Sequence, residues 1–550
     1  MPLALRLVAV HLARPLRHRP ALDLLTAADD PRAGVRELLS WSARVLDPDA
    51  DRLLCMLGLL PVADPDVTVA AAACGWELPR TRDVFERLAD VNMVQYRGPG
   101  RYGMHELVRE YARERAAGLP DAAGLPDAAG LLDAERAAAC DRVETLFLAA
   151  ALEASRRLGM ATDLAERDRV AVPDALTGLV APDVQGWLRD HRGSVAAVAR
   201  QAQDRGAHAA VRRLSDAWWR HLYKDMRDAE ARDLHSIALV SAESAGDRLA
   251  RCRALRHLGV LDTRAGRGDD ARHRFDEAAR EAHELGEPAE EAEATGLLAS
   301  MHAALAEYGP AIAWLHRTLE LTDQVPDSAS RASLLNNLGM LYRKIGDLDR
   351  ASTVLDEALH EAVATSDTDV ESAAHNNLGS LERERGDLTA AHAHLRAALD
   401  AARRACNLEG EAVVLTKLAD VAGARGDVEA AKAYLDAAAL ISAESGTPHL
   451  RNLVWNARGE WALTVHDLAA AARAHQQVLL PAADARDMPE LARAYAGLGQ
   501  VARVEGRTSQ ARDYLRRAAE EYRRLGSPHA SAIEAQLRAL RTRRGQSSSS

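Results

Sequence analysis

Two stretches of the chain repeat one pattern of apolar, small and polar positions at a distance of forty residues. The first, NNLGMLYRKIGDLDRASTVLDEAL, begins at Asn336, and the second, NNLGSLERERGDLTAAHAHLRAAL, begins at Asn376. Within each stretch the apolar residues recur three and four positions apart, which is the period of one face of an α-helix. The pattern breaks at a Gly-Asp pair, because glycine closes a helix in a left-handed conformation and aspartate caps the next helix. Each repeat is therefore predicted to be two antiparallel helices.

Three columns extend this spacing over about eight units, roughly from residue 210 to residue 535. An alanine column contains Ala231, Ala271, Ala311, Ala351, Ala391, Ala431, Ala471 and Ala511. Four positions later, large residues form a column of His235, Phe275, Leu315, Leu355, Leu395, Leu435, His475 and Leu515. Twelve positions before the alanines, small residues form a column of Gly259, Ala299, Gly339, Gly379, Ala419, Gly459 and Gly499.

Small residues on both helices predict a close crossing of the two backbones. A larger side chain at Ala351 or Ala391 would overpack this contact at a cost of about 1–3 kcal/mol. The position just before the small column is Leu in every unit except one, which has Arg458. Since one hairpin cannot bury its own apolar face, the hairpins must stack into a solenoid.

The repeat resembles the tetratricopeptide repeat, in which small–Leu–Gly and Ala–aromatic/Leu–Ala positions flank the turn. LNNLGMLYRKIGD is especially similar to the long form of this repeat in kinesin light chains and bacterial signalling proteins. The resemblance implies a superhelix in which the first helix of each hairpin lines the concave side. The usual unit of this family has about 34 residues. The additional residues in each forty-residue unit of this chain imply helices somewhat longer than usual.

The resemblance also implies a binding groove on the concave side. The inward positions that we take as candidate peptide or protein contacts are Arg256, Asn336, Arg343, Asn376, Arg383, Asn456 and Arg503. An asparagine amide can donate to and accept from a peptide backbone, and arginine pairs with carboxylates. These residues favour an extended peptide that bears acidic side chains or a free carboxylate. Alternatively, the asparagines only connect neighbouring hairpins.

A different pattern precedes the repeats. Residues 41–116 predict three helices, a short β-hairpin around Gly98-Pro99-Gly100 and a fourth helix, the order of a winged-helix domain. The candidate recognition helix, RTRDVFERLADVNMV, balances three arginines (Arg80, Arg82 and Arg87) against three acidic residues. Because phosphate contact needs an excess of positive charge, DNA binding through this helix is the alternative function and not the favoured one.

Three motifs carry a second resemblance. RYGMHELVREYARERA resembles the end of the winged-helix part of NB-ARC signalling ATPases, the STAND class, which carry Met-His-Asp where this chain has Met104-His105-Glu106. WSARVLDPDADRLLCMLGLLP and VQGWLRDHRGSVAAVARQA are similar to the streptomycete antibiotic-regulator branch. The opening MPLALRLVA is similar to the Gly-Leu-Pro-Leu segment of that class. The resemblance implies the C-terminal part of such a regulator and makes His105 a relic of a nucleotide sensor.

The motif for nucleotide hydrolysis is absent from the sequence. No G-x-x-x-x-G-K-S/T occurs, and the four lysines (Lys224, Lys344, Lys417 and Lys432) all lie in the repeats. GPGRYG matches G-x-G-x-x-G, but it lies in the predicted hairpin without a βαβ unit. We therefore expect no enzyme activity, no cofactor and no metal site, and a packing or capping role for His105. A P-loop domain encoded just before Met1 would make the chain a fragment of a larger regulator.

Composition narrows the class of protein further. The 550 residues carry a formal net charge of −11, which argues against nucleic-acid binding by bulk charge. The five cysteines lie far apart and predict neither a disulfide framework nor a zinc site. No apolar run of about 18 residues occurs, so we expect a cytoplasmic bacterial protein without a membrane span. Self-association stays open.

The predicted fold class is all-α. The segments are a helical remnant of an NB-ARC core (1–40), a winged-helix domain (41–116), a linker (117–134), bridging helices (135–209), a tetratricopeptide-repeat solenoid (210–540) and a disordered tail (541–550). The predicted function is a non-enzymatic interaction module, the sensor or scaffold part of a bacterial signalling or transcriptional regulator.

Overall fold

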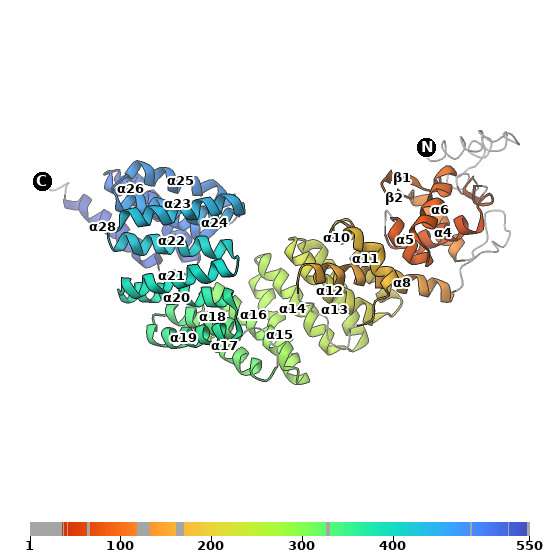
Figure 1. Ribbon diagram of the computed structural model, residues 1–550, viewed down its shortest axis with the longest axis horizontal. Coiled ribbons are helices and arrows are strands. Elements are labelled where there is room, and N and C mark those ends of the chain that lie inside the picture. The colour runs from red at the N-terminus through yellow and green to blue at the C-terminus, as the bar shows by residue number, and fades with distance from the viewer. Residues whose placement is uncertain are drawn as a thin grey trace. The chain divides into compact units, whose positions relative to one another are not determined.

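The protein divides into two compact units, which we describe separately: unit 1, residues 1–266, and unit 2, residues 267–550 (Figure 1). The computed structural model describes residues 36, 38–40, 42–62, 66–117, 133–160, 170–325, 331–484, 487–525, 527 and 529–546. The predicted core remnant at 1–40 and the predicted linker at 117–134 fall largely outside these residues. Everything described is helical or connecting chain except one two-stranded sheet.

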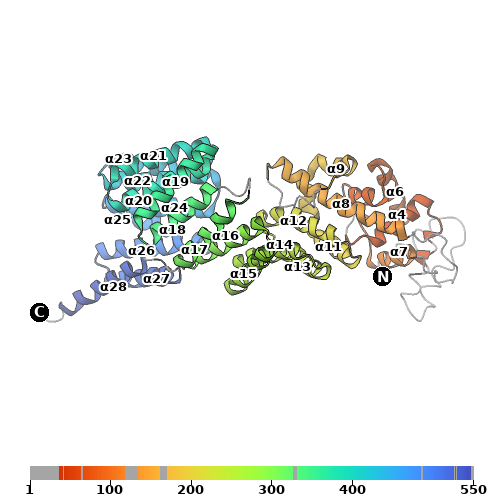
Figure 2. The same cartoon turned by 90° about the horizontal axis from the view of Figure 1, so that it is seen from below.

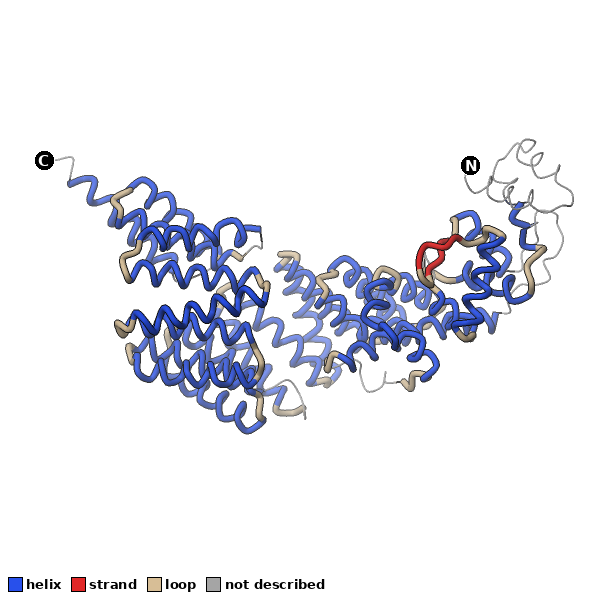
Figure 3. The backbone as a smooth tube through the Cα atoms, turned by 45° about the horizontal axis from the view of Figure 1, so that its top comes forward, coloured by secondary structure: helices blue, strands red, loops and turns tan. Residues whose placement is uncertain are grey.

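Unit 1 begins with the predicted order of three helices, a hairpin and a fourth helix. The elements are α4 (Pro48–Leu59), α5 (Val67–Cys74), α6 (Leu78–Asp90), β1 (Gln95–Gly98), β2 (Arg101–Gly103) and α7 (Glu106–Ala116). Asp47 and Asp66 cap α4 and α5 by accepting hydrogen bonds from backbone N–H groups of the first turn. The antiparallel hairpin is the red segment of Figure 3.

The rest of unit 1 packs directly against these first elements. It contains α8 (Asp133–Arg157), α9 (Asp174–Val180), the 3-10 turn η2 (Ala181–Asp183), α10 (Val184–His191), α11 (Val195–Asp204), α12 (His208–Lys224), α13 (Asp228–Ala245) and α14 (Arg248–Arg264). The indole N–H of Trp187 on α10 donates to Thr68 Oγ1 on α5 at 2.7 Å, and Arg142 on α8 donates to the carbonyl of Ala72 at 2.9 Å. One core therefore joins the front elements to the bridging helices.

Unit 2 consists of helical hairpins in which successive helices pack side by side (Figures 1 and 2). Its helices are α15 (Gly268–Leu285), α16 (Pro288–Ala304), α17 (Tyr308–Thr322), α18 (Arg331–Lys344), α19 (Leu348–Thr365), α20 (Thr368–Arg385), α21 (Leu388–Arg404), α22 (Leu408–Ala424), α23 (Val428–Ser445), α24 (Pro448–Thr464), α25 (Leu468–Asp484), α26 (Met488–Val504), α27 (Thr508–Arg524) and α28 (His529–Gln546). Helix α28 extends six residues into the segment predicted as a disordered tail, because its Ala-, Leu- and Arg-rich sequence favours a helix.

The predicted close crossings are present in the repeats of both units. Every member of the alanine column, from Ala231 to Ala511, is fully buried. A Cβ atom added at Gly339 would lie 2.5 Å from Leu355 Cγ, and one added at Gly379 would lie 2.7 Å from Leu395 Cγ. The close crossing of the two helices in each of these hairpins thus leaves little room for a side chain at Gly339 and Gly379, in agreement with the small residues that the sequence places there.

The turn between the helices of a hairpin keeps one geometry even where its sequence changes. Gly346 has a φ of 83°, in the left-handed region that glycine adopts without strain, and Asp347 caps α19. At the equivalent positions Ala306 and His466 have φ values of 58° and 61°. Packing of the two helices therefore imposes the turn on residues that do not favour it.

No described helix combines the length and the apolarity that crossing a membrane would require.

Candidate functional site

The first helices of neighbouring hairpins in unit 2 are joined by polar side chains. Asn377 on α20 donates to Asn336 Oδ1 on α18 at 2.9 Å. Two turns further along the same helices, Arg343 on α18 forms an ion pair with Glu384 on α20. We call the surface formed by these positions of α18, α20 and α22 the first-helix face.

The same type of contact joins the next pair of first helices. Arg383 on α20 forms an ion pair with Asp420 on α22 at 3.1 Å, and Lys417 Nζ on α22 donates to Ser380 Oγ on α20 at 2.9 Å. Because equivalent positions repeat every forty residues, side chains from three hairpins line up on one surface. Three of the predicted contact residues, Asn336, Arg343 and Arg383, take part in these contacts, and Asn376 lies on α20 with Arg383.

The first-helix face carries more positive than negative charge. Its charged residues are Arg343, Lys344, Arg383 and Lys417 against Glu384 and Asp420. Burial lowers the pKa of Lys417 to about 7, and the nearby charges of Arg343, Arg383 and Lys344 act in the same direction. The pKa of Lys344 is also lowered, first by burial and then by Arg343. The neighbouring cationic side chains therefore disfavour the charges of Lys417 and Lys344, and an added anion would relieve this repulsion.

Asn376 lies on α20 and has unused hydrogen-bonding capacity. Its Oδ1 atom is buried and has no hydrogen-bond partner among the described residues. A buried carbonyl oxygen without a partner costs about 1–3 kcal/mol. A backbone N–H of an extended peptide is the kind of donor that would satisfy it.

Asn456 corrects the sequence prediction, because it is not on the surface. It is fully buried, and its amide donates to the backbone oxygen of Glu490 at 2.8 Å and to Glu490 Oε2 at 2.8 Å. Its Oδ1 accepts from His475 Nδ1 at 2.9 Å. The amide is therefore committed to holding α24, α25 and α26 together, which is the alternative role that the sequence left open.

The other predicted residues lie apart from the first-helix face. Arg503 is exposed on α26 and donates to Gln500 Oε1 of its own helix at 2.8 Å. Arg256 lies half-buried on α14 of unit 1. His105 caps α7, because its Nδ1 accepts from the backbone N–H of Leu107 at 3.3 Å. The capping role predicted for His105 is thus the one observed.

Lys417, Asn377 and Ser380 belong to this face and were not predicted from the sequence. All three lie on first helices, close to the predicted position of Asn376. Asn377 follows it directly, Ser380 lies one turn further along, and Lys417 is the equivalent of Asn377 in the next repeat. Lys417 was detectable in principle, since it is one of only four lysines and takes the place held by asparagine in the two preceding repeats.

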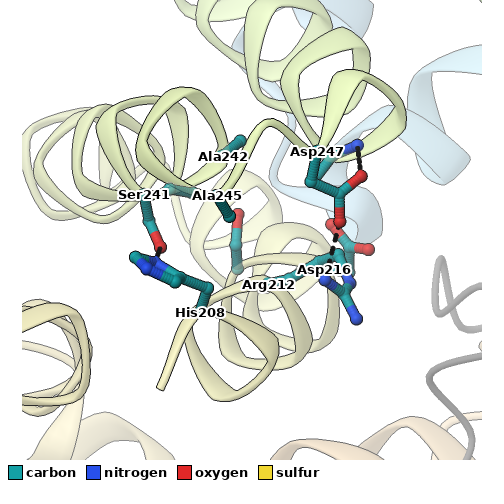
Figure 4. A pocket seen from close by; sticks show the side chains of 10 residues that line it. His208, Arg212, Asp216, Ser241, Ala242, Ala245 and Asp247 are labelled. Atoms are coloured by element: carbon teal, nitrogen blue, oxygen red, sulfur yellow. Dashed lines mark hydrogen bonds and ion pairs between the residues drawn. The ribbon is translucent and has the colours of Figure 1, made fainter. Parts of the chain in front are cut away.

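A polar cleft in unit 1 has a structural role. His208 Nδ1 lies 2.7 Å from Ser241 Oγ, and Arg212 forms an ion pair with Asp247 at 2.8 Å (Figure 4). Asp247 also caps α14 through the backbone N–H of Ala250. The free volume is only about 10 Å³, which is at most the space of one water molecule. These groups fasten α12, α13 and α14 to one another.

The candidate recognition helix has little positive charge to offer to DNA. Arg80 on α6 forms an ion pair with Asp49 at 2.8 Å, and Arg87 forms one with Asp47 at 3.2 Å. Two of its three arginines are therefore neutralised within unit 1, and Arg82 remains exposed beside acidic neighbours.

Comparison with known proteins agrees with this geometry. The family model of the tetratricopeptide repeat matches residues 290–360. The repeats within these residues are tetratricopeptide repeats. The regulatory protein AfsR of Streptomyces coelicolor is 28% identical over 397 residues, an alignment that covers 65% of this chain and 36% of that protein. AfsR of Streptomyces griseus is 35% identical over 127 residues, or 20% of this chain and 12% of that protein. The chain thus spans about a third or less of these relatives.

One solved structure is similar over most of the chain. It is a STAND protein with a tetratricopeptide repeat sensor from Pyrococcus horikoshii, 12% identical, with a TM-score of 0.44. The similarity covers 96% of this chain and 65% of that protein.

Proposed function

We propose that the first-helix face of unit 2 binds an extended peptide or protein segment carrying acidic side chains. The tetratricopeptide repeats would then act as the non-enzymatic sensor or scaffold part of a bacterial signalling or transcriptional regulator. The observation that carries the proposal is that Arg343, Lys344, Arg383 and Lys417 outnumber Glu384 and Asp420 on the first-helix face.

Two further observations support this function. The Oδ1 atom of Asn376 has no partner among the described residues and would gain one by accepting from a peptide N–H. The sequence relationship to AfsR, a regulatory protein, supports a role in regulation. The arginine and asparagine side chains together provide what an extended acidic peptide needs, namely charge pairing for its side chains and hydrogen bonds for its backbone.

Fluorescence polarisation with a labelled decapeptide of alternating Glu and Ala tests the proposal. We expect the peptide to bind the full chain and its Gln-for-Glu counterpart to bind at least tenfold more weakly. The double variant Lys344→Gln/Arg383→Gln should lower the affinity for the Glu peptide about tenfold, because each lost charge contributes on the order of 0.5–1 kcal/mol. Equal affinity for the Glu and Gln peptides would contradict the proposal.

A matched control removes one positive charge elsewhere in unit 2. Arg396 is exposed on α21, a second helix of its hairpin, so Arg396→Gln should leave peptide binding unchanged. Asn376→Ala is the complementary variant: it removes an amide oxygen that has no partner, so peptide affinity should fall while the melting temperature stays the same or rises.

Direct DNA binding by residues 41–116 is the second candidate function, and the ion pairs of Arg80 and Arg87 weigh against it. A gel shift on promoter DNA at low salt decides between the two. A shift that disappears as salt is raised would favour this candidate over the peptide-binding function.

A further inference from the structure

Arg458 interrupts a column that is otherwise leucine. The equivalent residues Leu258, Leu298, Leu338, Leu378, Leu418 and Leu498 are all buried. The guanidinium of Arg458 instead extends to Asp436 on α23, at 2.7 Å, and lies 5.6 Å from the centre of the Trp455 ring. A leucine is therefore missing from the packing between α24 and its neighbours at this one place.

Arg458 lines a cavity of about 600 Å³ that is widely open to solvent. Helices α23, α24 and α25 form it, and Lys432, Trp455, Arg458, Trp461, Arg473 and Gln477 are among the residues that line it. Pockets for small organic ligands have volumes of about 300–1,000 Å³ and combine apolar walls with a few polar groups. The size and the two indole rings fit this description.

The polar groups of the cavity are suited to an anion. Lys432 and Arg458 share one carboxylate, Asp436, at 3.0 and 2.7 Å, and Arg473 is exposed without an ion pair among the described residues. Three cations thus face one carboxylate. The indole Nε1 of Trp461 is buried and has no hydrogen-bond partner among the described residues. An indole N–H can only donate, so it requires an acceptor that the described part of the protein does not supply.

We propose that this cavity is a second binding site, for a small planar aromatic carboxylate. Its ring would stack on Trp455 and Trp461, and its carboxylate would accept from Trp461 Nε1 and pair with Arg458 or Arg473. The site is separate from the first-helix face, because second helices α23 and α25 contribute much of its lining. It therefore does not depend on the proposed peptide-binding function.

Isothermal titration of the full chain with naphthalene-2-carboxylate tests the proposal, with the neutral naphthalene-2-carboxamide as the matched ligand. We expect the carboxylate to bind at least tenfold more tightly and to change the tryptophan fluorescence. Arg458→Leu restores the residue of the other repeats and should lower the affinity at least tenfold. Trp461→Phe keeps an aromatic ring but removes the donor, and should lower the affinity several-fold.

Two controls make the test specific. Arg396→Gln removes a positive charge outside the cavity and should not change carboxylate binding. Arg458→Leu should leave binding of the acidic decapeptide unchanged, so failure of one site is distinguishable from failure of the other. The proposal is overturned if the carboxylate does not bind at millimolar concentration, if the carboxamide binds equally well, or if Trp461→Phe, a folded variant, binds with unchanged affinity.

Discussion

Two hairpins of unit 2, α18/α19 and α24/α25, place the same residue types in one column and use them differently. Asn336 on α18 lies near the surface and accepts one hydrogen bond from Asn377. Asn456 on α24 is fully buried and binds both Glu490 and His475. The difference follows from the partner helix, since a hydrophobic residue occupies the position of His475 in the first hairpin.

Two glycines, Gly459 and Gly497, leave room for the imidazole ring of His475. A Cβ atom added at Gly459 would lie 2.5 Å from His475 Nε2, and one added at Gly497 would lie 2.2 Å from the same atom. Asn456 Oδ1 can only accept, so His475 Nδ1 carries the proton and Nε2 stays without a partner. Burial lowers the pKa of His475 to about 4. His475 at a leucine position thus has two small neighbours and a buried amide as its partner, and Asn456 is internal where Asn336 is near the surface.

Truncating the two asparagines gives the largest expected contrast. Asn456→Ala should lower the free energy of unfolding by about 2–3 kcal/mol, because it leaves His475 Nδ1 and a buried carboxylate of Glu490 with fewer partners. Asn336→Ala should cost less than about 1 kcal/mol, because Asn377 can then bind water. Urea denaturation followed by circular dichroism measures both. Equal losses would show that the two asparagines do not differ in role.

A double variant sharpens the same comparison. Asn456→Ala with His475→Leu reproduces the residues of the last repeat, Ala496 and Leu515. We expect the double variant to be more stable than the sum of the two single losses by about 1–2 kcal/mol, because the two residues satisfy each other. Additive losses would mean that the hydrogen bond at 2.9 Å contributes little.

The hairpin α22/α23 lies between these two in the sequence and carries a lysine, Lys417, on its first helix. Lys417 on α22 has a pKa lowered to about 7 from 10.5. Above pH 10.5 the side chain is neutral in both states, and below pH 7 it is charged in both, so stability should rise with pH between these limits. Lys417→Met should remove a rise of about 1–2 kcal/mol between pH 7 and 9. Melting temperatures across this range measure the effect, and parallel pH profiles for the two proteins would refute it.

The smallest expected effect concerns the turns. Ala306 holds a positive φ where Gly346 stands in a later repeat. Ala306→Gly should stabilise the protein by about 0.5–1 kcal/mol by removing strain, and Gly346→Ala should destabilise it by a similar amount. Differential scanning fluorimetry resolves both shifts. A loss of stability on Ala306→Gly would mean that the flexibility gained by the unfolded chain outweighs the strain.

The periodic part of the fold could be predicted from the sequence because the same types of small, apolar and turn residues recur in successive repeats. Buried alanines, glycines under leucines and Gly-Asp turns each follow from local rules, and the hairpin around Gly98 follows from its turn residues. The division into two units at residue 266 lies within the predicted solenoid and has no such signal.

The candidate site was less predictable, because its properties arise between hairpins. Whether an asparagine lies on the surface depends on residues such as His475 and Glu490, which belong to other helices. The pKa of Lys417 is likewise lowered first by burial between helices and then by the charges of Arg343 and Arg383 on two other hairpins. Arg458 was visible as a departure from the leucine column, but its consequence, a cavity, requires the positions of α23 and α25.

The stacking of the repeats in unit 2 has a mechanical consequence. Each hairpin packs mainly on the hairpins next to it, as α20 does on α18, α19, α21 and α22. Tension applied to the ends of unit 2 would therefore extract the chain stepwise, with about 14 nm of contour length per forty-residue repeat at ~3.6 Å per residue. In an optical trap, the step that contains His475 would require a different force from its neighbours, since polar bonds and not leucine contacts must break there.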